Sequence, residues 1–392
     1  MNIGIDATCW WNNRGFGRFT RELLTALFQL ETNHHFYLFV DQSLHELADF
    51  SNVSVVQVAS SRPTTEAAVA DSSRSVFDMH KLYKAVADTP LDIMFFPAVY
   101  SWYPVPRGLP SMVTVHDAIA EHYPKLIFPK WKNRLFWTLK VKLALWRSSR
   151  ILTVSQAAKA EIIEYMKVSG GSIDVAGAAS NPNFKQTRDR ALMLAARQRA
   201  QLPADAPIIV YVGGLAPHKN LHGLIDGFEK AIQSGRIGEL HLALIGDFKG
   251  GGFLSNYDSL NEKVMASPTL CNRVHFSGYV SDEDLMALYS SAIAAAMPSF
   301  SEGFGLPAIE AMACSAPVLS SDRGSLPEVV GDAGLYFDPF DTQDICKAII
   351  EIVENAALRA RLSANAVARS RAFTWERAAR LTLRHLENLH GS

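Results

Sequence analysis

Two glutamates separated by seven residues, Glu302 and Glu310, lie in a stretch whose pattern predicts a strand, a loop and a helix. An apolar run ending at Met297 predicts the strand, and Pro307 stands where the first turn of a helix tolerates proline. A helix start suits a phosphate because its unbonded N–H groups and positive dipole end point outward. Here these groups are the amides of Gly303, Phe304, Gly305 and Leu306. The two carboxylates could then hold two parts of one ligand, although an acid such as Glu302 can also simply complement the dipole.

A second strand and helix meet around Lys219. The apolar run over residues 208–212 predicts a strand, and a helix is expected from Leu221 to about Ile232. Lys219 therefore lies at a helix start, where the dipole disfavours a cation. A bound anion would explain a lysine at this place.

Further polar or glycine-rich groups lie where predicted strands end. His116 follows the run Val113–Val115, and ligands of parallel α/β sheets bind beyond the carboxyl ends of strands. Its alternative role is structural, because an imidazole readily satisfies loop carbonyls. The N-terminal strand is followed by Gly15, Phe16 and Gly17 and then by a helix expected from Arg18 to Leu30. This G-x-G makes either an anion-binding corner or a plain tight turn.

The loop and helix around Glu302 and Glu310, with their continuation from Pro317 to Pro339, resemble the nucleotide-sugar site of retaining glycosyltransferases of family 4, which have the GT-B fold. The resemblance implies that Glu302 lies by the transferred sugar and that Glu310 binds the ribose. It also implies that Lys219 contacts the diphosphate and that His116 approaches the sugar near its anomeric carbon. The resemblance covers essentially the whole chain.

Other parts of the expected donor site follow from the same resemblance. The backbone near Tyr279 and Val280 would receive the nucleobase, and Gly246 would lie in a turn at the ligand edge. Gly15, Phe16 and Gly17 would face the donor phosphates across an interdomain cleft. The chain departs from the family at two positions of this site, Gly214 and His218, where arginine is usual or frequent. One phosphate cation is therefore missing, and His218 or a basic residue of the first domain, such as Arg14 or Arg18, must compensate for it.

The resemblance implies transfer of a hexose, with retention, from a nucleoside-diphosphate sugar to a hydroxyl of a glycan or lipid-linked acceptor. Exopolysaccharide, O-antigen or other cell-surface polysaccharide synthesis is the expected setting, with UDP-glucose the favoured donor and GDP-mannose the alternative. Lys219 and the loop amides would stabilise the leaving diphosphate, so neither a metal nor a cofactor is expected. The rival functions are a sugar-nucleotide epimerase or hydrolase of the same fold and a binder without activity.

Asp282 and Asp284 form a D-x-D pattern, by which another class of glycosyltransferases holds a metal ion. Ser281 before them is a natural N-cap, and acids are favoured in the first turn of a helix. The capping interpretation is preferred, and the two acids are left out of the expected site.

The length of 392 residues exceeds what one hydrophobic core usually supports. Alternating strands and helices predict an α/β protein of two doubly wound, Rossmann-like parallel-sheet domains. We expect an acceptor-side domain over residues 1–180, a linker over 181–206 and a nucleotide-sugar domain over 207–372. A terminal helix over 373–392 is expected to pack back on the first domain.

The composition argues against several classes of protein. A formal net charge of −1 speaks against a protein that coats nucleic acid. The four cysteines form no C-x-x-C pair, so neither a disulfide framework nor a zinc site is indicated. The N-terminus has no basic leader, and no apolar run reaches the ~18 residues of a membrane span. We therefore expect a cytoplasmic protein.

The segment from Lys125 to Arg150 carries eight lysines and arginines and no acid. Residues 131–146 predict an amphipathic helix with a basic face, a pattern typical of a helix that lies on anionic lipid. Trp131 and Trp137 would be its interfacial aromatics, and the protein would then be peripheral at the inner face of the membrane. The alternative is a solvated cationic face whose aromatics pack on the sheet.

Overall fold

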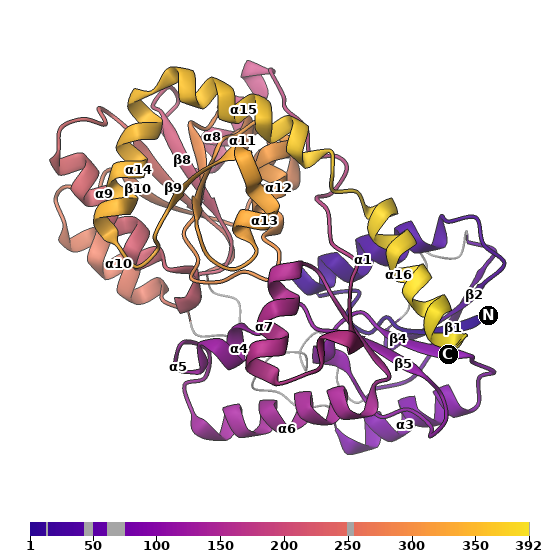
Figure 1. The fold of residues 1–392 in the computed structure, drawn as a ribbon. Helices are drawn as coiled ribbons and strands as arrows, with labels where there is room; N and C mark the ends of the chain where they lie inside the picture. The colour runs from indigo at the N-terminus through magenta and orange to yellow at the C-terminus, as the bar shows by residue number, and fades with distance from the viewer. Residues whose placement is uncertain (13–14, 43–49, 61–74, 249–254, 392) are drawn as a thin grey trace. The chain divides into compact units, whose positions relative to one another are not determined.

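The computed structural model describes residues 1–12, 15–42, 50–60, 75–248 and 255–391. They form two compact units (Figure 1). The first unit contains Met1–Pro124, Phe128–Ala178 and Trp375–Ser392, and the second contains Lys125–Ile127 and Ala179–Thr374. The chain thus leaves the first unit after Ala178 and returns to it for its last helix.

A seven-stranded sheet forms the centre of the first unit, in the order β3-β2-β1-β4-β5-β6-β7 with every pair parallel. The strands are β1 (Asn2–Asp6), β2 (His35–Val40), β3 (Val53–Gln57), β4 (Ile93–Phe96), β5 (Ser111–Thr114), β6 (Arg150–Thr153) and β7 (Ile173–Val175). Every residue of β4 and β5 is buried, as in central strands that helices cover on both faces. The sequence did not predict β7, because three residues are too few for a periodic signal.

The helices expected from Arg18 to Leu30, over residues 131–146 and over 373–392 are present in the first unit, within a few residues of the predicted bounds. The helices of this unit are α1 (Gly15–Phe28), α3 (Val76–Ala87), α4 (Ile119–His122), α6 (Trp131–Arg147), α7 (Gln156–Met166) and α16 (Trp375–His390). The short α5 (Pro124–Ile127) lies between α4 and α6 in the chain, and all of it except Pro124 belongs to the second unit. Ser75 and Ser155 cap α3 and α7, their hydroxyls accepting from backbone N–H groups of the first turns. α16 packs against α1, with the ring of Trp375 edge-on to Phe19 at 5.7 Å.

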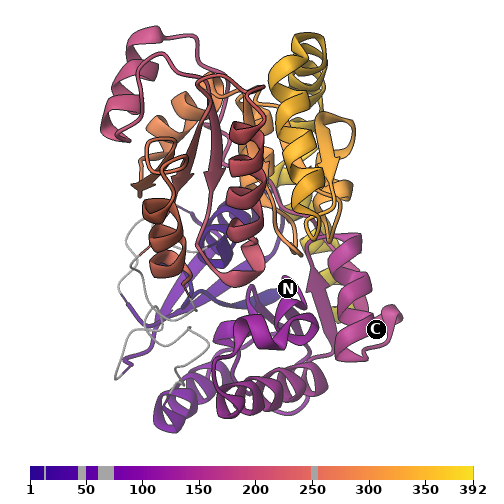
Figure 2. The same ribbon diagram turned by 90° about the vertical axis from the view of Figure 1, so that its left-hand side faces the viewer.

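The second unit holds a six-stranded parallel sheet in the order β10-β9-β8-β11-β12-β13, with helices on both of its sides (Figure 2). Its strands are β8 (Ile208–Val212), β9 (His241–Ile245), β10 (Val274–Gly278), β11 (Ala294–Met297), β12 (Val318–Ser321) and β13 (Gly334–Phe337). Its helices are α8 (Arg190–Arg199), α9 (Leu221–Gln233), α10 (Tyr257–Ala266), α11 (Asp282–Ser291), α12 (Leu306–Ala313), α13 (Leu326–Val330), α14 (Thr342–Glu354) and α15 (Ala356–Ser370). Side chains of β8, β9, α9 and α14 form a continuous buried core.

Strand order changes direction once in each sheet. In the second sheet the chain runs outward from β8 to β10, and then starts again on the other side of β8 with β11. β8 and β11 are therefore neighbours, but the loops that follow them lead toward opposite edges of the sheet. Proteins of this architecture bind their ligands in the crevice that such a switch point opens. Lys219 follows β8, and Glu302 follows β11.

The expected fold class is confirmed, since both units are doubly wound parallel α/β sheets. One local prediction was wrong: Gly15, Phe16 and Gly17 form the first turn of α1 instead of a loop before it. None of the helices within the described ranges is both long and apolar enough to cross a bilayer.

Candidate functional site

The centre of the site is a contact between Lys219 and Glu302. The ammonium Nζ of Lys219 donates to both carboxylate oxygens of Glu302, at 2.7 and 2.8 Å. The hydroxyl of Ser299 donates to the same carboxylate at 2.6 Å. Lys219 ends a short 3₁₀ turn after β8, and Glu302 lies between β11 and α12, so the switch point of the sheet brings together residues that are 83 positions apart.

This pair keeps Glu302 ionised. Burial alone would raise the pKa of its carboxyl, but the charge of Lys219 and the hydrogen bonds from Lys219 and Ser299 outweigh burial and lower the pKa. The two side chains keep only 23% and 15% of their surface exposed, so solvent screens their attraction less than on an open surface. The site therefore presents a fixed cation and a fixed anion side by side.

His218, the neighbour of Lys219, is uncharged near neutral pH. Burial lowers its pKa to about 3, and the adjacent charge of Lys219 adds to the effect. Its buried ring nitrogen Nδ1 has no hydrogen-bond partner within the described part of the chain. In this state His218 can donate a hydrogen bond to a ligand. Because the ring is uncharged, it does not replace the positive charge that is missing for binding the diphosphate.

Backbone contacts clamp the loop that carries Glu302. Gly324, in the loop after β12, has φ +58°, and a Cβ there would lie 2.8 Å from the backbone nitrogen of Glu302. The N–H of Ser325 donates to the carbonyl of Glu302 at 3.2 Å, and the N–H of Phe300 donates to the carbonyl of His218 at 2.9 Å. Only a glycine at position 324 allows both the positive φ and the close approach to the nitrogen of Glu302. The loops after β8, β11 and β12 thus form one assembly.

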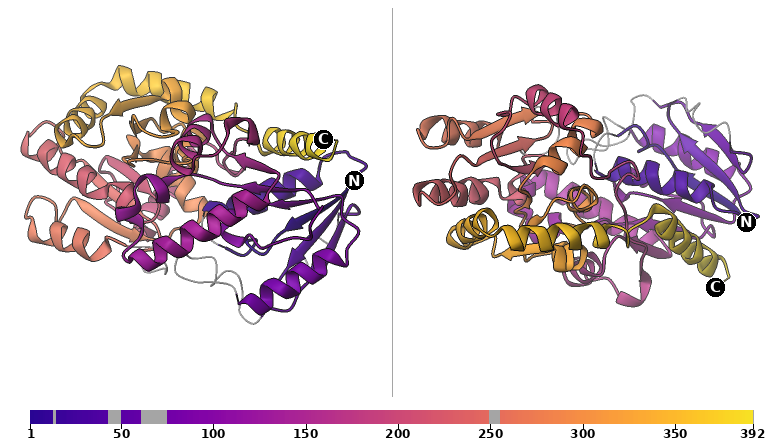
Figure 3. Two further views of the ribbon diagram at one scale, coloured as in Figure 1. Left: turned by 60° about the horizontal axis from the view of Figure 1, so that its bottom comes forward. Right: turned by 90° about the horizontal axis from the view of Figure 1, so that it is seen from above.

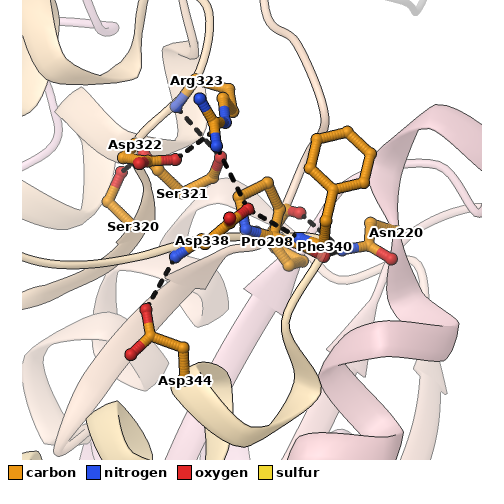
Figure 4. Close-up of polar contacts among 10 residues, drawn as sticks. Asn220, Pro298, Ser320, Ser321, Asp322, Arg323, Asp338, Phe340 and Asp344 are labelled. Carbon is orange, nitrogen blue, oxygen red and sulfur yellow. Dashed lines mark hydrogen bonds and ion pairs between the residues drawn. The ribbon is translucent and has the colours of Figure 1, made fainter.

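A polar network extends this assembly to the loop after β13 (Figure 4). The amide of Asn220 donates to the carbonyls of Pro298 and Pro339, at 3.2 and 2.7 Å. Arg323 pairs with Asp322 at 3.1 Å and with Asp338 at 3.3 Å. Asn220, Gly324 and Arg323 were not predicted from the sequence as part of the site. Asn220 carried a signal, because asparagine tolerates the left-handed φ better than most residues, and its φ here is +55°.

The helix start expected after Glu302 is present. Gly305, at φ +89°, is the N-cap of α12, and Pro307 lies in its first turn. Gly303 and Phe304 are buried, and the ring of Phe304 stands edge-on to Phe373 at 5.7 Å. Leu306 is the first helical residue, and Glu310 lies one turn further on, where it is buried.

Glycines line the sheet edge beside Lys219. Gly213, Gly246 and Gly278 follow or end β8, β9 and β10, and the N–H of Gly246 donates to the carbonyl of Gly278 at 2.9 Å. A Cβ on Gly246 would lie 2.1 Å from the carbonyl oxygen of Gly213. The ends of these strands therefore pack backbone against backbone, and a side chain at Gly246 would not fit.

The remaining predicted residues of this unit lie at the same edge. Gly214 is exposed, and its carbonyl accepts from the hydroxyl of Tyr211 at 2.7 Å. Tyr279 and Val280 follow β10 in a loop, with 80% of Tyr279 exposed. In the strand order, Gly246, Tyr279 and Val280 thus follow strands on one side of β8, and Glu302 follows β11 on the other side. Contact of these residues with a donor stays a prediction.

His116 lies in the first unit, after β5. Its Nε2 hydrogen bonds to the carbonyl of Pro97 at 3.1 Å, and Phe19 stands edge-on to its ring at 4.7 Å. Burial lowers its pKa to about 4, and the bond to Pro97 only partly offsets this effect. The ring is therefore neutral with its proton on Nε2. The approach of His116 to the donor sugar stays a prediction.

Close packing between α1 and the loop before it requires a glycine at position 17. A Cβ on Gly17 would come within 2.0 Å of the carbonyl oxygen of Asn12, so any other residue would push α1 away from the loop before it. Phe16 stacks on Tyr100 at 4.8 Å, and Arg18 lies in the same helix turn. Arg14 lies outside the described residues.

The D-x-D acids have structural partners. The hydroxyl of Ser281 accepts from the N–H of Asp284 at 3.1 Å, so the predicted N-cap is confirmed. The carboxylate of Asp284 accepts from Arg199 of α8 at 3.0 Å. Within the ranges that the structure describes, no group of three or more His, Cys, Asp and Glu side chains could hold a metal ion.

Comparison with known proteins agrees with this arrangement. The family model described as Glycosyltransferase Family 4 matches residues 13–177, and the one described as Glycosyl transferases group 1 matches residues 194–369. The chain is 33% identical to the O-antigen chain mannosyltransferase B of Escherichia coli over 70% of its own length and 69% of that protein. It is 29% identical to the serotype-specific mannosyltransferase WbdA of Escherichia coli over 60% of its length, but spans only 28% of that larger protein.

Solved structures share the whole fold. Sucrose-phosphate synthase of Thermosynechococcus elongatus superposes with a TM-score of 0.75 at 20% identity, covering 100% of this chain and 99% of that one. Anabaena HepE in complex with UDP and glucose superposes with a TM-score of 0.72 at 18% identity, covering 99% and 100%. Taken with the matches along both units, these findings show that the chain belongs to glycosyltransferase family 4 (glycosyl transferases group 1) and has the GT-B fold.

Proposed function

We propose that this protein transfers mannose from GDP-mannose, with retention, to a hydroxyl of a growing cell-surface polysaccharide of the O-antigen kind. The observation that carries the transfer is the Lys219–Glu302 pair at the switch point of the second sheet, beside the start of α12. Both similar Escherichia coli proteins are described as mannosyltransferases, which favours GDP-mannose over the UDP-glucose that the sequence analysis put first. HepE, at 18% identity, supports the fold and not the donor.

The geometry suits the charges of such a reaction. An ammonium has three N–H donors, and Glu302 takes two of those of Lys219, so one remains for a phosphate oxygen. As the bond to the sugar breaks, negative charge grows on the leaving diphosphate, where Lys219 and the amides of Gly303 to Leu306 stabilise it. The carboxylate of Glu302 stabilises the positive charge that grows at the anomeric carbon. The acceptor hydroxyl attacks on the same face, and the leaving phosphate takes its proton.

The test is a donor and acceptor matrix. The protein is incubated with GDP-mannose or UDP-glucose, each with and without a lipid-linked oligosaccharide acceptor, and nucleotide release and the anomeric configuration of the product are measured. We expect GDP release that depends on the acceptor and an α-linked product. Release without acceptor would indicate a hydrolase or epimerase, and nucleotide binding with no release would indicate a binder. Turnover with UDP-glucose but not with GDP-mannose would show that UDP-glucose is the donor.

A companion measurement addresses metal dependence. Because Lys219 and the loop amides can neutralise the diphosphate, we expect turnover to persist after EDTA treatment. A loss of activity restored by magnesium or manganese would instead return Asp282 to consideration as a metal ligand.

A further inference from the structure

The outward side of α6 is apolar. Trp131, Leu135, Leu139 and Leu143 recur every four residues and are exposed, with Trp146 continuing the stripe and Phe136 beside it. Trp131 and Trp146 leave 70% and 77% of their surface in solvent. Single exposed apolar residues are ordinary, but a continuous stripe of large ones marks an interaction surface.

Among the residues that the structure describes, α6 packs against the first unit through the side opposite to this stripe. Trp137, Val141 and Ala144 are buried, and Nε1 of Trp137 donates to Glu121 at 2.8 Å. Lys140 donates to the carbonyl of Tyr100 at 2.6 Å. The predicted interfacial role of Trp137 was therefore wrong, and Lys140 is not one of the free cations. Both lie on the inward side, whereas Trp131 is exposed as predicted.

Cations lie among the outward apolar residues. Lys132 and Lys142 are exposed, and the 3.6-residue period places them on the same side as the stripe. Lys130 and Arg134 are exposed nearby, and the sequence has no Asp or Glu from residue 124 to residue 150. The helix thus combines an apolar surface with positive charge instead of separating a basic face from a buried apolar one.

We propose that the outward side of α6 docks in the plane of a bilayer that contains anionic phospholipid. The apolar side chains would enter the boundary between headgroups and acyl chains, and Lys132 and Lys142 would meet the lipid phosphates. α6 runs along the outside of the first unit (Figure 3). A second copy of the chain is the poorer partner, because a two-fold contact of α6 with α6 would bring lysines together without an acid on either helix. This inference does not depend on the proposed sugar transfer.

The experiment measures co-sedimentation of the full chain with phosphatidylcholine vesicles, with and without phosphatidylglycerol, at low and high salt. We expect binding to the anionic vesicles that weakens with salt. Changing Lys132 and Lys142 to Gln should lower the partition coefficient about thirty-fold, since each cation near an anionic surface contributes about 1 kcal/mol. Changing Trp131, Leu139 and Trp146 to Ser should abolish binding at every salt concentration. Tryptophan emission should shift to the blue on binding to these vesicles, and this shift should be lost after Trp131→Phe with Trp146→Phe.

The matched controls are Met265→Ser and Lys347→Gln. Both residues are exposed and lie in the second unit, and the substitutions are of the same kinds as those in α6. They should bind like the unchanged protein, and circular dichroism should show every variant folded. Absence of binding by the unchanged protein, or equal binding by the α6 variants and the controls, overturns the proposal. A dimer in sedimentation velocity that the α6 substitutions dissociate, without vesicle binding, would assign the stripe to self-association instead.

Discussion

Glu302 and Lys219 were expected to serve different parts of the donor, and the structure joins them in one ion pair. Changing either residue therefore changes the electrostatic state of the other. Glu310 is not part of this ion pair, so substitutions at Glu302 and at Glu310 should have different effects.

Glu302→Gln should lower turnover by ~10²–10³ while leaving the dissociation constant for GDP unchanged or smaller. The amide keeps the size of the side chain but removes the negative charge beside Lys219, which then faces the diphosphate alone. Glu310→Gln should instead weaken GDP binding by about tenfold or more, because the charge-assisted hydrogen bond that we expect between Glu310 and the ribose would be lost. Titration calorimetry and initial rates measure both effects. The role assignment fails if the two affinities change in the opposite order.

Lys219→Ala should reduce GDP affinity and turnover together, since its charge acts in the ground and transition states alike. It should also lower the free energy of unfolding at pH 7 by about 2 kcal/mol, between the values of exposed and buried pairs. The pKa of Glu302 is depressed in the folded state, so the stability that it contributes is present above its unfolded pKa and lost as pH falls through its folded pKa.

Denaturation of the native protein and of Lys219→Ala at a series of pH values checks in which direction this contribution to stability changes with pH. The difference in unfolding free energy should begin to narrow at about pH 4.3, the ordinary pKa of a glutamate, where the unfolded chain takes up the proton. It should narrow further as pH falls through the lower pKa of Glu302 in the folded state, below which the carboxyl is protonated in both the folded and the unfolded chain. A difference that is constant with pH would mean that the pair does not hold Glu302 ionised.

At the scale of elements, strands and most helices could be predicted because a buried parallel strand and an amphipathic helix leave different periodic signals. The ion pair could not, since it depends on β8 and β11 being neighbours although 83 residues separate its members. The inward side of α6 could not be assigned either. Apolar residues occur on both of its sides, and periodicity does not say which one meets the sheet.

Gly324→Ala tests the clamp on the Glu302 loop. The new Cβ would stand 2.8 Å from the nitrogen of Glu302, so the loop must shift, and a displacement of about 1 Å can lower turnover by about 10²-fold. Gly235→Ala is the matched control. Its φ of +72° imposes a similar backbone strain, but no atom lies within 4 Å of the added Cβ. Both variants should melt at lower temperature, and only Gly324→Ala should lose activity. Equal activity in the two would show that the clamp does not position Glu302.

At the scale of the whole molecule, the chain places its last two long helices in different units. α15 belongs to the second unit, whereas α16 lies in the first, against α1, although only the four residues 371–374 separate the two helices. Leu362 of α15 and Leu386 of α16 are both buried. The same substitution at these two positions therefore affects two different hydrophobic cores.

Leu386→Ala should destabilise the first unit by ~2–5 kcal/mol, because the cavity it leaves is only partly filled by relaxation. Hydrogen exchange should accelerate in β1 and α1 and stay slow in β8 and β11, since local stability follows the cooperative unit that is disturbed. Leu362→Ala, the matched control, should give the opposite pattern. GDP should raise the melting temperature of the second unit in both variants, because the Lys219–Glu302 site lies there and a ligand stabilises the unit that binds it. Faster exchange in both units after either substitution would mean that the chain unfolds as one cooperative body, and that the division into two units has no thermodynamic counterpart.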